Sequence, residues 1–337
     1  MKDFLVKLVM LNLQLFAWAE GQAGTATTQP INVTTQDSMS PTMKTFYDTT
    51  LLENAREEMI FTQFGKKQPL KGNTVEWRKF NTFEKALTPL QEGVIPTGKN
   101  FGMTKIEAST TQHGDYVAVS DRLELESFDD VIFGATEEMG ATEGETYDTL
   151  TRNILVAGNS VAYAGGKTSR ATLTNADVLT PAMINKAVTW LKKNKAPKLD
   201  GSYVAIIHPS VAEDLRESEE WKEFHKYNEC APIWKGEIGM LHGCRFVESN
   251  EAKIWRAGAD GVAVYATLFL GKDAFGILDP DGEGMEMIIK TKEQIGGPLN
   301  QFSTIGYKFC HGAKILYQER MLRVETGSSY GSDDEEN

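Results

Sequence analysis

The feature that most constrains this sequence is the stretch 73–120, in which strand-forming runs flank a long irregular excursion. Aromatic and β-branched residues stand among polar neighbours around Trp77 and again around Val117. Residues 90–99 lie between these runs, contain glycine and proline, and show no helical period. The pattern predicts two strands joined by a long excursion. Because a loop of this length is uncommon in a compact domain, it indicates a role in binding or another function.

A long helix is predicted over residues 128–157. Its weakly polar and apolar residues step by three or four and form one narrow stripe: Ile132, Ala135, Met139, Thr142, Thr146, Leu150, Ile154 and Ala157. Gly134, Gly140 and Gly144 interrupt this helix, and each costs about 1 kcal/mol of helix stability relative to alanine. The glycines fit either a bend with close backbone approach or a local weakness that packing tolerates, and both interpretations stay open.

The remaining chain mixes helices and strands without a regular alternation. A first helix is predicted from Pro41 to Gln63, and a second domain begins near Thr180, which caps a helix ending near Lys195. A buried strand, Tyr203–Ile207, and another helix follow it. Later strands are predicted at Cys244–Val247, Gly261–Tyr265, around Phe269, at Gly276–Leu278, Met287–Lys290, Gly306–Cys310 and Lys314–Val324. This intermixing predicts the α+β class.

The N-terminal residues 1–19 allow two interpretations. Two lysines, an apolar run and a small-x-small pattern ending at Ala19 are typical of a secretory signal. However, Asn12 and Gln14 interrupt the apolar run, which is also too short to span a bilayer. We therefore favour an apolar arm that packs on its own body or on a neighbour. Residues 20–42 are small and polar, and they predict an extended linker.

Composition excludes several classes of protein. A chain of 337 residues is long enough for about two domains, and its 47 acidic against 35 basic residues give a net charge of -12. This balance argues against a protein whose whole surface coats nucleic acid. Cys230, Cys244 and Cys310 are too few for a disulfide scaffold and lack the spacing of a zinc site. No metal, cofactor or catalytic site is predicted.

Two glycine-containing segments resemble ligand loops but lack their essential residues. Gly165–Thr168 looks like the end of a phosphate-binding loop, yet Val161 stands where the loop needs its first glycine. Asp279–Gly284 has the acid spacing of a calcium loop, yet Lys290 stands where the closing glutamate should be. Both segments are predicted to be turns.

His208 and Ser210 follow a predicted strand, but the Gly-x-Ser-x-Gly elbow of a serine nucleophile is missing. We expect His208 to satisfy backbone groups at the strand end and Ser210 to cap the next helix.

Charge is segregated along the chain. Residues 121–148 contain ten acids and one base, whereas residues 66–105 contain eight bases and three acids. These blocks are either two solvated faces of a monomer or the two sides of a head-to-tail contact between copies. The second hypothesis gives eight candidate contact residues: Arg78, Lys79, Lys85, Lys99, Glu137, Glu138, Glu143 and Glu145. The acidic run at 332–337 is predicted to be a solvated tail.

The order of these elements resembles that of the major capsid (coat) proteins of tailed bacteriophages and prophages. Five short motifs carry the same resemblance: Asn12–Ala17, Ile207–Ser210, Gly236–Gly239, Gly243–Ser249 and Gly297–Phe302. The resemblance covers nearly the whole chain and implies the shell fold of that family. Its parts would be an N-terminal arm with the first helix (1–65), an extended loop hairpin (66–120), a peripheral domain with a long spine helix (121–179 and 291–331), an axial domain (180–290) and the acidic tail (332–337).

The resemblance also implies a function. Such proteins are structural subunits of the virion that self-assemble into the hexamers and pentamers of an icosahedral head. The head encloses double-stranded DNA, which the subunits do not bind in a sequence-specific way. Neither a cofactor nor a membrane is expected. Assembly in the bacterial host cytoplasm is expected, with a separate scaffolding protein, a portal and cement proteins as further partners. A separate scaffold is expected because no long charged helical segment precedes the arm. No covalent cross-linking pair is assigned.

Two alternatives remain open on the sequence alone. A secreted or surface-associated protein would use the N-terminal run as a signal, and mature protein starting at Glu20 would favour it. An enzyme would use His208 or His242.

Overall fold

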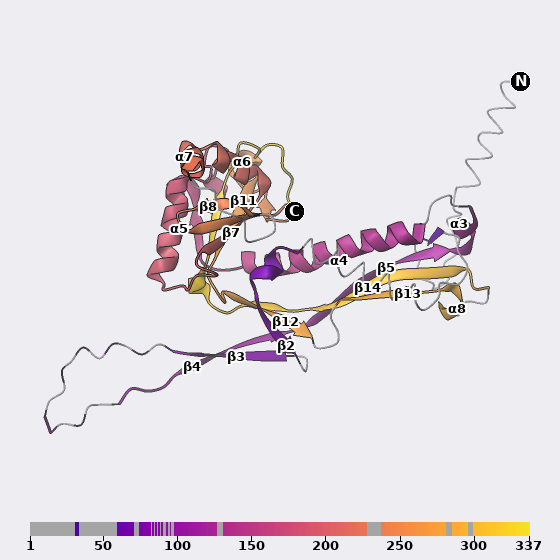
Figure 1. The fold of residues 1–337 in the computed structure, drawn as a ribbon, viewed down its shortest axis with the longest axis horizontal. Helices are drawn as coiled ribbons and strands as arrows, with labels where there is room; N and C mark the ends of the chain where they lie inside the picture. Colours follow the sequence, from indigo (N-terminus) through magenta and orange to yellow (C-terminus); the bar gives the residue numbers. More distant parts are fainter. Residues whose placement is uncertain are drawn as a thin grey trace, which may run out of the picture.

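The computed structural model describes most of the chain from Met59 onward. The described residues are 31–33, 59–70, 74–81, 83, 85, 87, 89, 92–93, 95, 98–126, 131–227, 237–280, 285–295 and 299–337. They form a lobe, a long limb and a two-stranded hairpin that projects away from both (Figure 1). The N-terminal run and almost all of the predicted first helix, Pro41–Gln63, lie outside the described residues.

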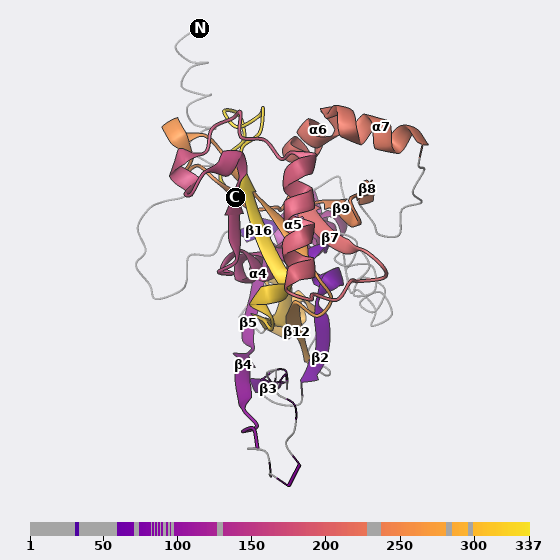
Figure 2. The same ribbon diagram turned by 90° about the vertical axis from the view of Figure 1, so that its left-hand side faces the viewer.

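The lobe is built on a seven-stranded sheet. Its strands lie in the order β6 (Val161–Tyr163), β16 (Met321–Thr326), β11 (Val264–Leu270), β7 (Tyr203–Ile207), β9 (Cys244–Glu248) and β8 (Glu237–Leu241), and β10 (Ile254–Trp255) also pairs with β11. Three helices belong to the lobe: α5 (Pro181–Lys193), α6 (Pro209–Glu217) and α7 (Glu219–Tyr227). Figure 2 shows α5 lying along the sheet beside β16.

Strand β7 shows why this sheet is the centre of the lobe. All five of its residues are buried, as expected of a strand covered on both faces. Ala205 and Ile207 face one core together with α5 and α6, whereas Val204 and Ile206 face another core. The second core also contains Leu155, so it joins the lobe to the limb.

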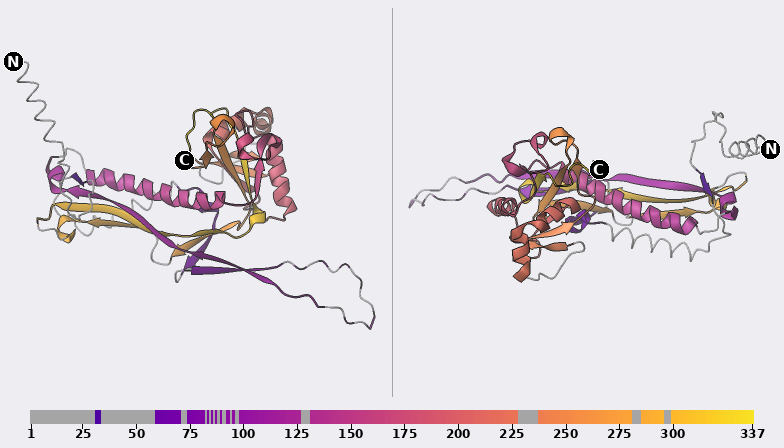
Figure 3. Two further views of the ribbon diagram at one scale, coloured as in Figure 1. Left: turned by 180° about the vertical axis from the view of Figure 1, so that it is seen from behind. Right: turned by 90° about the horizontal axis from the view of Figure 1, so that it is seen from above.

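The limb consists of a long helix lying on a four-stranded sheet. The sheet has the order β1 (Ile31–Val33), β5 (Thr111–Ser120), β14 (Phe302–His311) and β13 (Glu286–Lys290). Helix α4 (Val131–Val156) runs along it, and α3 (Asp121–Glu126) and α8 (Lys292–Ile295) lie at its far end (Figures 1 and 3). Strand β1 is parallel to β5 and lies within the predicted linker.

A small sheet connects the three parts. It has the order β15 (Ala313–Ile315), β12 (Phe275–Pro280) and β2 (Lys66–Leu70). The 3₁₀ turn η1 (Phe61–Phe64) precedes β2. Four more 3₁₀ turns occur in the described chain: η2 (Ala164–Gly166), η3 (Arg170–Thr172), η4 (Ala259–Gly261) and η5 (Gln318–Arg320).

The hairpin pairs β3 (Thr74–Phe80) with β4 (Met103–Ser109) in antiparallel register, from Thr74 opposite Ser109 to Phe80 opposite Met103. The predicted strand around Trp77 and the long excursion after it are confirmed, but the residues around Val117 belong to β5 in the limb sheet, and the partner of β3 is β4. The hairpin extends beyond the small sheet, away from the limb (Figures 1 and 3).

The sheets cross the domain boundaries predicted from the sequence. Strand β16 lies within 291–331, which was predicted to be peripheral, but it is central to the lobe sheet. Strand β13 lies within 180–290, which was predicted to be axial, but it pairs with β14 in the limb. Strand β6, within 121–179, likewise pairs with β16 in the lobe sheet. The linear division is wrong at these three strands because sheet pairing joins segments far apart in the chain.

Local signals at helix starts are mostly confirmed. The Thr180 side chain caps α5 by accepting from Met183 N, and Pro181 occupies the first turn. At α6 the prediction for His208 is confirmed, because its Nδ1 accepts from the backbone N–H of Ser210. The prediction for Ser210 is wrong, because His208 itself is the cap. The predicted turn at Gly165–Thr168 is confirmed, because Gly165 and Gly166 adopt positive φ values of 61° and 69°.

Candidate inter-subunit surfaces

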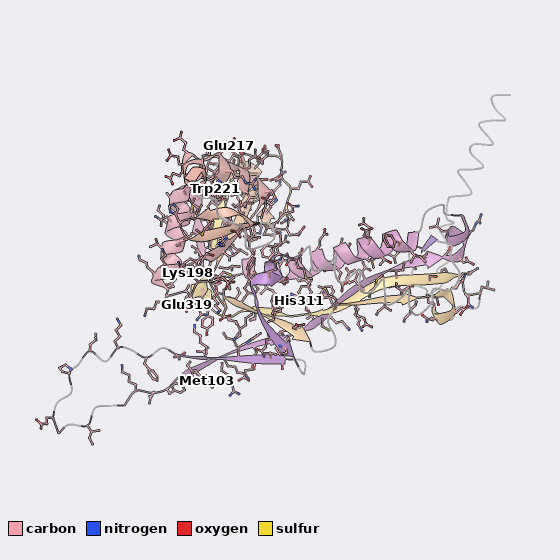
Figure 4. The ribbon with its side chains drawn as sticks, viewed as in Figure 1. Met103, Lys198, Glu217, Trp221, His311 and Glu319 are labelled. Atoms are coloured by element: carbon pink, nitrogen blue, oxygen red, sulfur yellow. The ribbon has the colours of Figure 1, made fainter. Side chains whose placement is uncertain are left out.

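The far half of the hairpin exposes large apolar side chains. Leu87 and Ile95 are 84% and 93% exposed, and four more residues are at least half exposed: Phe80, Phe83, Phe101 and Met103. Figure 4 marks Met103 on the hairpin, well away from the lobe. Soluble monomers rarely gather exposed apolar side chains in this way, so the cluster indicates an interaction surface.

Three phenylalanines give this surface a defined shape. The ring of Phe101 lies 4.8 Å from that of Phe80 and 5.8 Å from that of Phe83, between centroids, with the ring planes tilted. These distances fall in the range of favourable aromatic pairs. The rings therefore form one contiguous apolar patch across the two strands, which we call the hairpin patch (Phe80, Phe83 and Phe101).

Salt bridges fix the base of the hairpin within the subunit. Arg78 Nε lies 2.9 Å from a Glu76 carboxylate oxygen, and Lys105 Nζ lies 2.9 Å from the other oxygen of the same carboxylate. Both cations lower the pKa of Glu76, with Lys105 contributing most. Lys79 lies 3.4 Å from Glu319 on η5. Two of the predicted contact residues, Arg78 and Lys79, are thus paired inside the subunit.

Lys79 makes a second contact that ties the hairpin to the body. Its ammonium lies 4.5 Å from the centre of the Tyr317 ring, close enough for a cation–π interaction. Tyr317 and Glu319 belong to the turn between β15 and β16, and Glu319 is labelled in Figure 4 near the base of the lobe. The hairpin therefore has a fixed root and an exposed far end. Lys85 and Lys99, the other two predicted basic contacts, are exposed in that far part.

The predicted acidic residues on α4 divide into two groups. Glu137, Glu138 and Glu145 are exposed along the helix. Glu143 has no exposed surface, so it is not a surface charge and its place among the contact candidates is corrected. The helix turns the Glu143 side chain toward the limb sheet, on the same face as Met139 and Tyr147, four residues away on either side.

Glu143 is a buried carboxyl without a polar partner. Neither of its carboxylate oxygens makes a hydrogen bond among the described residues. Burial raises the pKa of Glu143 from 4.5 to about 7. Near neutral pH this side chain is therefore close to the point at which its protonation state changes.

Asp148, one turn further along α4, has partners. Its carboxylate accepts from the backbone N–H groups of Ile60, Phe61 and Thr62, at distances of 2.9–3.3 Å. Burial raises the pKa of Asp148 to about 6, although these three hydrogen bonds act in the opposite direction. The contact attaches the chain just before β2 to the long helix.

The buried face of α4 therefore differs from the apolar stripe expected from the sequence. Thr142 and Ala157 of that stripe are exposed, whereas Thr136, Thr151 and Arg152 are buried. Each of these polar groups has a partner: Thr136 Oγ1 donates to Ile132 O at 2.7 Å, Thr151 Oγ1 lies 3.0 Å from His311 Nε2, and Arg152 Nη1 donates to Glu251 O at 2.7 Å.

Arg323 of β16 couples the end of α4 to the lobe. Its Nη1 donates to the carbonyl oxygen of Val156, which the helix leaves unpaired at its C-terminal end, and to that of Gly158 just beyond the helix. Its Nε donates to Glu325 at 2.8 Å, and Arg170 donates to both oxygens of the same fully buried carboxylate.

The guanidinium of Arg170 also lies 3.5 Å from the centre of the Trp255 ring, in a cation–π arrangement. The resulting network spans α4, η3, β10 and β16. No local sequence pattern connects its four residues, which lie far apart in the chain: Arg170, Trp255, Arg323 and Glu325.

The acidic C-terminal segment was predicted to be solvated: Asp333, Glu335 and Glu336 are exposed as predicted, whereas Asp334 is half-buried and hydrogen-bonded. Asp334 accepts from Ser210 Oγ at 2.6 Å and from Tyr265 OH at 2.5 Å. Asn337 binds the backbone at Ala252 and Ile254. The end of the described chain thus packs on the lobe, where the C label lies in Figures 1 and 3.

Two other kinds of site, a metal centre and a membrane-spanning helix, have no candidate among the described residues. Within the described ranges, no group of three or more histidine, cysteine, aspartate or glutamate side chains could hold a metal ion. Likewise, no helix in the described part of the chain has the length and apolar character needed to cross a membrane. Cys244 is a buried free thiol, and Cys230 lies outside the described residues.

Comparison with known sequences places this fold. Residues 114–277, which run from β5 into β12, match the family described as phage capsid protein. No curated protein sequence matches the chain at a significant level.

Solved structures are similar in fold to nearly the whole chain. It is similar to the capsid of Ralstonia phage GP4, with a TM-score of 0.65 and 16% identity over 96% of this chain and 97% of that one. The Cyanophage Pam1 capsid gives a TM-score of 0.64 and 12% identity, covering 92% and 100% of the two chains. The mature capsid of bacteriophage PhiM1 gives 0.58 and 13%, covering 92% and 95%.

These likenesses confirm the predicted α+β fold of tailed-phage major capsid proteins. They also support a structural virion subunit, and they give no support to a secreted or surface-associated protein.

Proposed function

We propose that this major capsid subunit assembles by laying the hairpin of one copy over the limb of the next. The observation that carries the proposal is the hairpin patch together with Leu87 and Ile95, which stand exposed on a projection remote from any core of their own subunit. Burying apolar side chains stabilises association by about 25 cal/mol per Å² before the costs of ordering are subtracted. A second copy offers such a surface without requiring any other protein.

Charge supports the same arrangement. The far part of the hairpin carries Lys85 and Lys99, and the exposed face of α4 carries Glu137 and Glu138. Opposite charges on two patches steer association and fix its register. A contact between two different patches is heterologous, and such contacts close into rings or extend into arrays. Hexamers and pentamers of an icosahedral head are rings of this kind.

Further partners belong to the same proposal. The net charge of -12 suits a shell that encloses double-stranded DNA without gripping it. We expect assembly in the host cytoplasm with a separate scaffolding protein, a portal and cement proteins. The limb would serve as the peripheral domain with α4 as its spine, and the lobe, including β6 and β16, would serve as the axial domain.

Electron microscopy of the purified chain tests the proposal. Lys85→Glu should reduce the yield of closed shells or hexamer sheets, and adding Glu137→Lys should restore part of it. Lys193→Glu on α5 makes the same change of charge away from both patches and serves as the control. Assembly by Lys85→Glu at the normal yield, or a wild-type chain that stays monomeric at high concentration, would refute the proposed contact.

A further inference from the structure

The C-terminal segment 332–337 occupies a polar site on the lobe. Its anchor is Asp334, whose Oδ2 accepts two short hydrogen bonds, from Ser210 at the start of α6 and from Tyr265 on β11. The Tyr265 side chain belongs to a residue that is only 1% exposed, so its hydroxyl is held in place by the core. Burial and the bond to Asp334 raise the pKa of Tyr265, so it remains a proton donor at neutral pH.

The second anchor is Asn337, which pairs with an open strand edge. Its side-chain Oδ1 accepts from Ile254 N at 2.9 Å, and its Nδ2 donates to Ala252 O at 3.1 Å. The N–H of one residue and the C=O two residues earlier are the pair that a neighbouring strand would bind. The carboxamide thus takes the place of a peptide group beside β10, whose other edge pairs with β11.

Two basic residues bind the main chain at and beside these anchors. Arg256 donates to the carbonyl oxygens of Ser332 and Asp334, at 2.8 and 3.1 Å. Lys253 donates to the main-chain oxygen of Asn337 and lies 3.9 Å from the Glu336 carboxylate. Side-chain recognition at two positions, supported by main-chain contacts, is how proteins read a short peptide.

We propose that this surface of the lobe is a binding site for an acidic peptide with the pattern Asp-x-x-Asn. The segment 334–337 supplies that pattern, Asp-Glu-Glu-Asn, and fills the site in the same chain. The segment of a second copy has the same chemistry and can take its place. This site is separate from the hairpin and α4, so the inference does not depend on the proposed assembly contact.

The direct test uses the full chain with a disabled segment, Asp334→Ala together with Asn337→Ala. The probe is a fluorescein-labelled peptide of residues 331–337, and its anisotropy reports binding. The peptide should bind the double variant saturably and the wild type at least about tenfold more weakly, because the wild-type segment is present at a high effective concentration. A scrambled peptide of equal charge should bind at least about tenfold more weakly than the probe.

Equal binding of the scrambled peptide, or equal binding to the variant and the wild type, would overturn the proposal. Adding Tyr265→Phe to the double variant should weaken probe binding, because the phenol is the donor to the aspartate.

Hydrogen exchange supplies an independent measurement on the otherwise unchanged chain. Asn337→Ala should increase the exchange rate of the Ile254 amide about tenfold, and Glu335→Ala, which changes a neighbouring side chain, should not. Unchanged exchange at Ile254 would also overturn the proposal. Protection of the Ile254 amide should be independent of protein concentration, because the chain's own segment is the occupant. Protection that rises with concentration would overturn this occupancy and indicate the segment of a second copy.

Discussion

Replacing Glu143 by glutamine should make the subunit less sensitive to alkaline pH. The carboxyl is fully buried and without a hydrogen-bond partner among the described residues, and its pKa is raised from 4.5 to about 7. Between these two values the folded state binds more protons at this site than the unfolded state does. Stability therefore falls as pH rises through the window, and the loss is complete above about pH 7.

The size of the effect follows from the shift. One pKa unit corresponds to 1.36 kcal/mol, so the difference between 4.5 and about 7 amounts to about 3 kcal/mol. Glutamine keeps the shape of the side chain and cannot ionise. It also leaves an amide unpaired, but this cost is the same at every pH. The difference in free energy of unfolding between wild type and variant should thus change by about 3 kcal/mol across this pH window, and the change favours the variant at high pH.

Urea unfolding of unassembled subunits at pH 5 and pH 8 measures this difference. The raised pKa of Asp148, about 6, and the lowered pKa of His311, about 4, add their own pH dependence. Both contributions cancel when the variant is subtracted from the wild type at each pH. Glu138→Gln, on the exposed side of the same helix, is the matched control. If Glu143→Gln follows the wild-type pH profile in parallel, the buried ionisation is not the cause.

Three further changes test other contacts. Arg323→Met should lower the free energy of unfolding by about 3–5 kcal/mol in urea titrations, because it leaves a buried carboxylate short of one partner. Arg216→Met breaks an exposed pair and should cost less than about 1 kcal/mol. Equal losses in the two variants would contradict this prediction. Asp148→Asn should speed hydrogen exchange at the Phe61 amide, and unaltered exchange would mean that the carboxylate does not anchor this segment. Phe101→Ser should reduce shell yield and leave subunit stability within about 0.5 kcal/mol, so a destabilised subunit would argue against a purely external role.

Local signals explain the parts of the fold that the sequence predicted. The hairpin follows from strand-forming runs around a glycine-containing excursion, and α5 follows from Thr180 and Pro181 at its start. Helix α4 was also found, because its residues repeat with a helical period over 26 positions. Each of these signals lies within one segment and needs no partner from elsewhere.

Features that depend on distant partners were missed. Glu143 was taken for a surface charge, because its burial is decided by the limb sheet rather than by its neighbours in α4. Asp334 was taken for part of a solvated tail, because Ser210 and Tyr265 lie far from it in sequence. Arg323 has no local pattern at all, and the two carbonyl groups that it binds lie at the end of α4 and just beyond it, far from Arg323 in sequence.

The position of β16 between β6 and β11 has a consequence for biosynthesis. The lobe sheet cannot close until residues 321–326 have left the ribosome, although β6 and β7 are made much earlier. At about 5–20 residues per second, the interval between synthesis of the hairpin strand β4 and of β16 is about 10–45 s. Throughout that interval the nascent chain presents the hairpin patch without a finished lobe, so folding is largely post-translational and premature termination before Met321 yields a chain that cannot complete its sheet.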